Sequence, residues 1–435
     1  MLCGLKDVSC SGVGSVEAVR ILNVTLRGIT LLSKFVLVFF LAKFLEPSLL
    51  GLYGLLAAAI GYSLYVVGFD FYNFSTREII RSNSVDWARI IRDQSVFYLV
   101  AYIFFFPVFF VVFYLGFLPW GMFFWFLILL FLEHFAQEVN RILVAMSEQL
   151  FASLILFLRS GFWCLAVVLF MWLDEGLRQL EFILAGWAIG AFSACALSLL
   201  KLRSLDRLAL CLPIDWRWMK RGVKVAAPLL VASLAVRGVF TIDRYWVESV
   251  TNLEVLGAYV LFISMAVAVL SFLDAGVVVF FYPKLVAAAK AKEFAVFRQV
   301  MRSFSVNIIV VTAFLVVSCW AIANPLLAWV GNDIYIQYLY LLHWLLLAIT
   351  FYSLSMVPHV ALYAFDKDKA ITYSQLAALV AFLIVAYLYS DAYGAQAIAW
   401  AICAAFGIML VWKAWVCRSL STFDSAEQGV LNDTR

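Results

Sequence analysis

Charged residues are scarce in this chain. Of its 435 residues, 27 are acidic and 31 are basic, so Asp, Glu, Lys and Arg make up 13% where a soluble protein has about 25%. These charges are too few to cover the surface of a soluble body. The composition therefore excludes a cytosolic enzyme, a secreted domain and a disordered scaffold.

Motifs of catalytic and metal chemistry are also missing. The eight cysteines form no CxxC pair, and no set of His, Cys and carboxylates has metal-ligand spacing, so we expect neither disulfides nor a metal site. No GxxxxGKS or GxxxxGKT loop occurs, which excludes an ATP-driven pump acting by itself. The first twenty residues contain no apolar core, so we expect no cleavable signal peptide. We expect no cofactor.

Apolar residues dominate instead. They make up 66% of the chain, and the mean hydropathy is +1.00. Continuous apolar runs, such as 96–117 and 308–322, exclude a membrane barrel, whose strands alternate apolar and polar residues over about 10 positions. One membrane helix takes roughly 20 apolar residues, so the length holds about twelve. The sequence predicts an all-α integral membrane protein.

Twelve apolar runs lie between charged breaks. Gly116 and Pro119 separate the third from the fourth, because proline interrupts a helix. The predicted spans are residues 21–42, 49–69, 95–115, 118–137, 149–172, 180–200, 224–246, 254–280, 303–323, 336–363, 371–389 and 394–416.

The basic residues alternate between loops. If both termini are inside, the inside segments hold 24 of the 31 Lys and Arg, and the outside loops hold only Lys43, Arg178 and Arg244. Membrane proteins carry such an excess on the cytoplasmic side, so we predict cytoplasmic termini. The predicted division is a cytoplasmic N-terminus at 1–20, a six-span N-lobe at 21–200, a cytoplasmic linker at 201–223, a six-span C-lobe at 224–416 and a cytoplasmic tail at 417–435.

The two halves resemble each other locally. Residues 27–35, with Arg27 and Lys34, match residues 237–245, with Arg237 and Arg244, at an offset of 210. Downstream, Leu50-Gly51-Leu52-Tyr53 matches Leu256-Gly257-Ala258-Tyr259 at an offset of 206. Since six spans separate the copies, both enter the membrane from the same side. We therefore predict parallel repeats about an axis along the membrane normal, as in transporters that rock two lobes around a central site.

Three stretches of the sequence resemble parts of a known family. The run 41–53 resembles the signature that closes the first span of polysaccharide flippases, with Lys43 where the signature has Arg. Residues 68–79 are similar to the second span and first cytoplasmic loop of those proteins, and Asp243-Arg244 followed by 257–259 resembles the matching place in their second half. The family is the Wzx-type O-antigen and polysaccharide flippases of the multidrug/oligosaccharidyl-lipid/polysaccharide exporter (MOP) superfamily.

The resemblance implies a fold and an activity. The fold is a V-shaped pair of six-helix lobes in the bacterial inner (plasma) membrane. The activity is to move an undecaprenyl-diphosphate-linked oligosaccharide from the cytoplasmic to the outer leaflet by alternating access, during lipopolysaccharide or other surface-glycan synthesis. Implied partners are membrane lipids and, as candidates, a polysaccharide polymerase and a chain-length regulator. Nucleic acid is not an expected partner.

Cations inside the spans are the candidate substrate-binding residues. Each costs at least about 2.5–3.5 kcal/mol at mid-bilayer, so it needs a cavity or a partner. A cationic lumen suits a diphosphate, which Arg binds through two parallel hydrogen bonds. The candidates are Arg27, Lys34, Arg159, Arg237 and, near the outer interface, Arg244. The alternative is that they only fix helix packing by pairing with Asp70, Glu133, Asp243 or Asp274.

The acids carry a second hypothesis. Asp70, Asp243 and Asp274 lie in or near spans and are candidates for coupling to a proton or cation, with capping or ion pairing as the alternative. Glu138, with His134 one turn before it, superficially resembles a proton relay. With Arg141 close by in the helix, an ion-pair cluster is the favoured interpretation.

Three other functions are alternatives. An ion-coupled exporter of small drugs or metabolites belongs to the same superfamily, but cationic drugs favour an acidic lumen. A membrane polysaccharide polymerase is an enzyme, and such enzymes need a sizeable loop with catalytic residues, which this chain lacks. A lipid II flippase often carries more than twelve spans. We therefore predict that the chain is not an enzyme.

Overall fold

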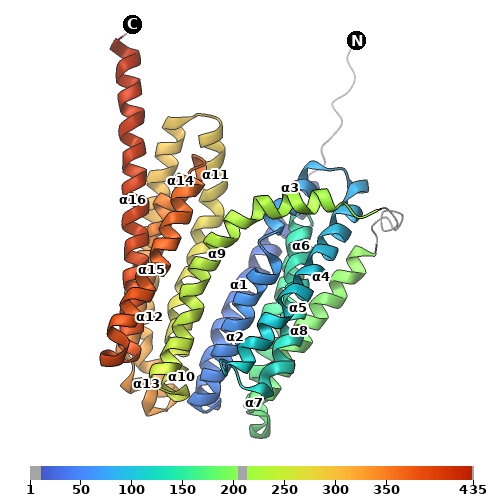
Figure 1. The fold of residues 1–435 in the computed structure, drawn as a ribbon, viewed down its shortest axis with the longest axis vertical. Helices are drawn as coiled ribbons and strands as arrows, with labels where there is room; N and C mark the ends of the chain where they lie inside the picture. Colours follow the sequence, from blue (N-terminus) through green and yellow to red (C-terminus); the bar gives the residue numbers. More distant parts are fainter. Residues whose placement is uncertain (1–10, 204–212, 434–435) are drawn as a thin grey trace.

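The computed structural model describes residues 11–203 and 213–433, and these ranges are almost wholly helical. In them, twelve spans are long and apolar enough to cross a membrane, which confirms the predicted number. Helices suit this setting because they satisfy every backbone polar group where no water can reach. Figure 1 shows two bundles side by side, the N-lobe and the C-lobe, so the predicted two-lobed all-α fold is confirmed.

The N-lobe contains the first six spans. Its fifth span joins two α-helices through a π-helical turn, η2, and η1 and η3 are short 3₁₀ turns. The elements are α1 (Ser11–Phe44), α2 (Pro47–Gly68), α3 (Tyr72–Arg81), α4 (Ser84–Tyr114), η1 (Trp120–Met122), α5 (Phe123–Ala145), α6 (Gln149–Phe157), η2 (Leu158–Phe162), α7 (Trp163–Leu173), η3 (Glu175–Leu177) and α8 (Leu180–Leu202).

The C-lobe contains the other six spans. A second π-helical turn, η5, interrupts its second span. The elements are α9 (Trp216–Val250), α10 (Leu253–Leu273), η5 (Asp274–Val278), α11 (Val279–Lys290), α12 (Phe294–Val330), α13 (Asp333–Gln337), α14 (Tyr340–Ala364), α15 (Asp368–Tyr393) and α16 (Ala395–Asp433).

Local sequence explains where several helices stop. The chain leaves α4 at Tyr114 and resumes helix at Trp120, so the break predicted at Gly116 and Pro119 is confirmed. Gly116 has a φ of 80°, in the left-handed region that favours glycine. The turn between α9 and α10 ends at Asn252, whose side chain accepts a hydrogen bond of 2.9 Å from the Val255 amide and so caps α10.

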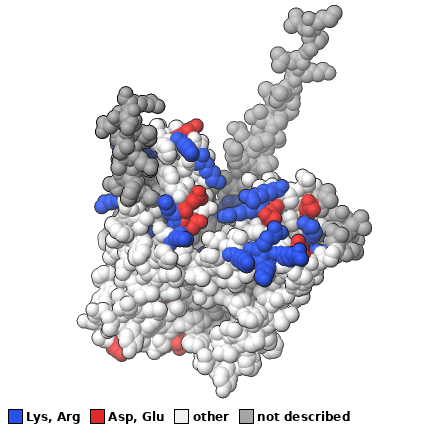
Figure 2. Space-filling model, turned by 45° about the horizontal axis from the view of Figure 1, so that its top comes forward, with Lys and Arg blue, Asp and Glu red and all other residues white. Residues whose placement is uncertain are grey.

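The two faces of the molecule differ in charge. We call the face where α1 begins and α16 ends the near face, and the opposite one the far face (Figure 1). Lys and Arg gather on the near face of both lobes, whereas the remaining visible surface carries few charges (Figure 2). The distribution agrees with the basic segments read from the sequence. That the near face is cytoplasmic stays a prediction from this charge.

The lobes meet most closely where α2 crosses α10, near the far face. A Cβ atom on Gly257 would overlap the carbonyl oxygen of Pro47, and one on Gly51 would overlap that of Leu253. Gly51 and Gly257 hold matching places in the internal repeat. The duplicated motif therefore builds the contact between the halves, and glycine is required there because the backbones touch.

A polar contact also closes the far face. The Lys43 ammonium group donates a hydrogen bond of 2.5 Å to the Trp329 carbonyl and lies 4.1 Å from the centroid of that indole ring. The Phe40 ring packs 5.2 Å from the same indole. These contacts join the end of α1 in the N-lobe to the end of α12 in the C-lobe.

The start of α9 lies on the other lobe. Trp218 and Met219 are buried in a cluster with Phe71 of the N-lobe, and the Phe71 and Trp218 rings are 5.4 Å apart. Figure 1 shows α9 running across the near face of the N-lobe before it turns into the C-lobe. Pro228 lies inside α9, and proline is a common cause of such bends. Part of the predicted 201–223 linker is thus helix, while residues 204–212 lie outside the described residues.

We expect the substitution Gly257→Ala to destabilise the protein. Alanine favours a helix by about 1 kcal/mol over glycine, so any loss of stability must come from overlap of the new methyl group with Pro47. Such overpacking costs about 1–3 kcal/mol. The measurement is the thermal unfolding temperature in detergent. Gly61→Ala on α2 is the control, because its added methyl group meets open space. Equal unfolding temperatures for the two variants would contradict a tight crossing.

Candidate functional site

A cavity of about 360 Å³ lies between the lobes, in the middle of the membrane-spanning region. The N-lobe contributes α1, α2, α5, α8 and the broken fifth span, and the C-lobe contributes α9 and α10. The charged residues in its wall are Lys34, Glu133, Arg159 and Arg244. The aromatic residues in its wall are Phe35, Phe39, Tyr53, Trp163, Trp187 and Phe272.

Arg159 is both paired and in the cavity wall. Its Nε lies 3.2 Å from Oε2 of Glu133, and the two side chains are 13% and 8% exposed. The other carboxylate oxygen of Glu133 accepts a hydrogen bond of 2.7 Å from the Trp187 indole. Arg159 belongs to η2, and π-helical turns often mark functional sites. The two alternatives drawn from the sequence, pairing and facing a lumen, are therefore not exclusive for this residue.

Lys34 and Arg244 are related by the internal repeat, and both line the cavity. Among the described residues, the Lys34 ammonium makes no hydrogen bond or ion pair, and its side chain is exposed to the cavity. The Arg244 guanidinium donates 2.7 Å to the Phe240 carbonyl, while its buried Nε has no partner. Arg244 lies six residues before the end of α9 and lines the cavity, in agreement with its selection as a candidate lumen cation, while its expected place near the outer interface stays a prediction. Three cations thus face the cavity with one acid.

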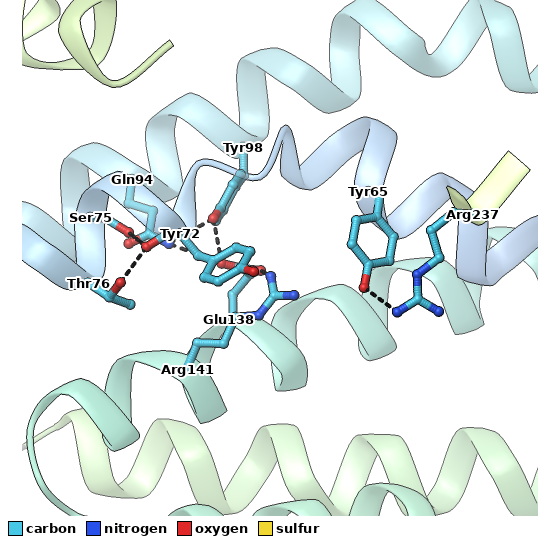
Figure 3. Close-up of polar contacts among 9 residues, drawn as sticks. All are labelled: Tyr65, Tyr72, Ser75, Thr76, Gln94, Tyr98, Glu138, Arg141 and Arg237. Atoms are coloured by element: carbon cyan, nitrogen blue, oxygen red, sulfur yellow. Dashed lines mark hydrogen bonds and ion pairs between the residues drawn. The ribbon is translucent and has the colours of Figure 1, made fainter. Parts of the chain in front are cut away.

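Arg27 and Arg237 lie elsewhere. The Arg27 Nε donates 3.2 Å to the Ser153 hydroxyl within the N-lobe, and Arg27 is not among the cavity-lining residues. Arg237 is exposed, and its guanidinium donates 2.8 Å to the Tyr65 hydroxyl and lies 4.8 Å from that ring (Figure 3). Since Tyr65 is on α2 and Arg237 on α9, this contact joins the lobes. Nothing in the local sequence marked Tyr65 as its partner.

The three candidate acids have different surroundings. Asp243 is fully buried, and its carboxylate accepts 2.7 Å from the Tyr259 hydroxyl and 2.7 Å from the Arg244 amide, so it fixes α9 to α10. Asp274 opens η5 and is exposed. Asp70 lies in the turn before α3 with a φ of 50°, is 2% exposed, and has one carboxylate oxygen without a partner.

Glu138 organises a polar cluster in the near-face part of the N-lobe (Figure 3). It pairs with Arg141 at 2.5 Å, accepts 2.5 Å from the Tyr98 hydroxyl and 3.1 Å from the Gln94 amide. The Arg141 guanidinium also lies 3.6 Å from the centroid of the Tyr72 ring. The ion-pair cluster expected from Glu138 and Arg141 is thus confirmed.

The structure also locates the cysteines and the other residue types that could bind a metal ion. Within residues 11–203 and 213–433, no group of three or more His, Cys, Asp or Glu could hold a metal ion. The cysteines Cys164, Cys195, Cys319, Cys403 and Cys417 are free. Cys3, Cys10 and Cys211 lie outside the described residues.

Comparison with known proteins gives a fold. No protein-family model and no curated protein sequence matches this chain. It is similar to the inward-facing structure of a multidrug resistance MATE family transporter of the MOP superfamily, with a TM-score of 0.69 at 12% identity over 92% of this chain and 96% of that one. The chain has the MATE transporter fold. This structural similarity agrees with the superfamily that the sequence resembles. It does not support the Wzx-type subfamily in particular.

Two other MATE structures differ in conformation. An outward-facing one has a TM-score of 0.56 at 15% identity over 93% of this chain and 96% of that one. One described as bent has a TM-score of 0.54 at 14% identity, over 93% of this chain and 94% of that one. The arrangement of this MATE-fold chain is therefore more similar to the inward-facing structure. The closed far face, with Lys43 on Trp329, agrees with that similarity.

We expect Arg159→Met to destabilise the protein more than the double substitution Glu133→Gln with Arg159→Met. The single change leaves a buried carboxylate without its cation, and breaking a buried ion pair costs about 3–5 kcal/mol. Replacing both partners removes that uncompensated charge. The measurement is a double-mutant cycle on unfolding temperature. Additive effects would contradict a direct interaction.

We expect Asp70→Asn to stabilise the protein more at pH 7.5 than at pH 4.5. Burial raises the pKa of Asp70, against the opposing effects of the Ser233 hydroxyl and the Arg141 guanidinium. Because the folded pKa is higher than the unfolded one, stability falls as the pH rises between the two values, and asparagine lacks this penalty.

The measurement is the difference in unfolding temperature from the wild type at both pH values. Asp86→Asn at the exposed start of α4 controls for the loss of one charge. A difference for Asp70→Asn that is the same at both pH values would contradict the raised pKa.

Proposed function

We propose that this chain is an alternating-access transporter that carries an anionic substrate between the two faces of the membrane. Its fold is that of transporters, and a polar cavity of about 360 Å³ lies between two lobes that are joined at the far face. A cavity in this place can open to one side at a time when the lobes rock against each other. The similar structures are transporters and not enzymes.

The charge of the cavity carries the substrate assignment. Lys34, Arg159 and Arg244 face it, and Glu133 offsets only one of them. Exposing cations at this depth is costly, so an anionic ligand that neutralises them gains a large electrostatic energy in a weakly screened site. A diphosphate esterified at both ends supplies two negative charges and several acceptor oxygens. We propose that the head of the substrate is a diphosphate.

The apolar part of the wall fits the rest of such a substrate. Phe35, Trp187 and Tyr53 give the cavity flat aromatic surfaces next to the cations. Aromatic rings pack well against the apolar face of a sugar, while the lipid tail stays in the bilayer beside the lobes. These features support a flippase for an undecaprenyl-diphosphate-linked oligosaccharide in a bacterial inner membrane. A polymerase and a chain-length regulator of surface glycans are its proposed partners.

The closed far face sets the order of steps in this proposal. The substrate head binds from the near face while Lys43 holds Trp329. Release on the far face then requires the Lys43 contact to break and α2 to move on α10. The hydrogen bond between Arg237 and Tyr65 also joins the lobes, closer to the near face than the Lys43 contact.

A second candidate is an ion-coupled exporter of small drugs or metabolites. The similar structures are described as multidrug resistance transporters, which favours it. The excess of cations in this cavity then restricts the cargo to anionic or neutral compounds. Asp70 and Asp274 are the described acids that remain available for ion coupling, because Asp243 is committed to Tyr259.

We expect a host that lacks this gene to lose surface polysaccharide and to accumulate a diphosphate-linked repeat unit. Wild type restores the glycan, and Lys34→Gln with Arg244→Gln does not, because two of the three cavity cations are gone. The control is Lys290→Gln with Lys292→Gln, an equal charge change on the exposed near face. Polyprenyl lipids are extracted and quantified, with protein levels checked in membranes. Unchanged glycan and lipids with altered sensitivity to small toxic compounds would instead support the exporter.

A further inference from the structure

A second hollow, of about 510 Å³, lies between the lobes and contains residues of α3, α9 and α15. Its cations are Arg77 from the N-lobe and Lys224 and Lys369 from the C-lobe, with Asp368 as its acid. It shares no lining residue with the central cavity. We call it the mouth site. Figure 2 shows basic side chains on this face of both lobes.

The cations of the mouth site are unpaired. Arg77, Lys224 and Lys369 are exposed, and none makes a hydrogen bond or ion pair with a described residue. Three basic residues elsewhere on the near-face side pair with acids: Arg92 with Asp93, Arg141 with Glu138 and Lys201 with Glu148. Three free cations from three elements around one hollow create a local positive potential that concentrates anions.

One wall of the mouth site is apolar. Val225, Pro228 and Leu229 of α9 line it beside the cations, with Tyr373 of α15. A free inorganic anion gains no binding energy from this apolar wall. A lipid with a charged head gains binding energy both from the cations and from the apolar wall. The site therefore matches an amphipathic anion that arrives from the surrounding membrane.

We propose that the mouth site binds the diphosphate head of the lipid-linked substrate before that head moves to the central cavity. The inference rests on the proposed function and adds a second binding station to it. Three cations against one carboxylate leave a net charge of +2, which matches the two negative charges of a doubly esterified diphosphate better than the single charge of a head such as phosphatidylglycerol. Lys and Arg both bind phosphate oxygens strongly through charge-assisted hydrogen bonds.

The position of the site makes it state-dependent. Arg77 belongs to the N-lobe and Lys369 to the C-lobe, so the distance between them changes whenever the lobes rock. A ligand that contacts both residues shifts the protein toward the arrangement that brings them together. The size of this shift depends on the difference between the ligand's affinities for the two states. Since both residues lie on the near face, that arrangement is one in which the near face closes.

Binding of inorganic diphosphate to the purified full-length protein tests the proposal. Titration calorimetry in detergent is expected to give two sites for the wild type. The triple variant Arg77→Gln, Lys224→Gln and Lys369→Gln is expected to weaken one site at least about tenfold, since a hydrogen bond to a charged group is worth about 1.5–3 kcal/mol. The matched control is Lys290→Gln, Lys292→Gln and Arg298→Gln, with the same charge change on the same face but outside the hollow.

The variants separate the failure of this inference from the failure of the proposed function. If the triple variant binds like its control while Lys34→Gln with Arg244→Gln loses a site, the mouth site is wrong and the central one stands. If no variant changes binding, both are wrong. In a second arm, phosphatidylglycerol vesicles compete with diphosphate. Displacement from the mouth site by these vesicles, and not by phosphatidylcholine vesicles, would assign the site to a phospholipid head and overturn the proposal.

Discussion

The low polarity of the bilayer governs where every intramembrane cation of this chain lies. A cation in a span needs a counter-charge, a polar partner or a cavity, since lipid supplies none. Arg159 has Glu133, Arg237 has the Tyr65 hydroxyl, and Lys34 reaches the central cavity. The space between the lobes accommodates a cation without a counter-charge, Lys34, whereas Arg27, Arg159 and Arg237 each have a polar partner.

A second constraint is the contact between the backbones of α2 and α10. Gly51 and Gly257 let these helices touch near the far face, and the Lys43 ammonium group on Trp329 reinforces that closure. These contacts join the lobes on the far-face side of the central cavity. Towards the near face, the start of α9 packs on Phe71 of the N-lobe and the Arg237 guanidinium bonds to the Tyr65 hydroxyl of α2. The lobes are thus joined on both sides of the cavity, and alternating access requires these contacts to change.

Sequence reasoning predicted much of this architecture. Twelve spans and the break at Gly116 follow from hydropathy and helix-breaking residues, which act locally, while the two lobes follow from the internal repeat and the family resemblance. The internal repeat was the most informative pattern, because it related Lys34 to Arg244 and Gly51 to Gly257. Arg27 was nevertheless grouped with the lumen cations, whereas the structure has it against Ser153 within the N-lobe. Counting along a helix gives depth from its end, and it does not say which way a side chain faces or how the helix leans.

The sequence by itself determined the membrane class, the number of spans, the duplication and the excess of cations over acids inside the spans. Each depends on composition or on neighbours a few turns apart. Only the tertiary structure decided that Arg159 pairs with Glu133 and Trp187, that Asp243 serves packing, and that the cations of α3, α9 and α15 surround one hollow. Such groupings join residues from different helices, and helix packing, not local sequence, brings them together.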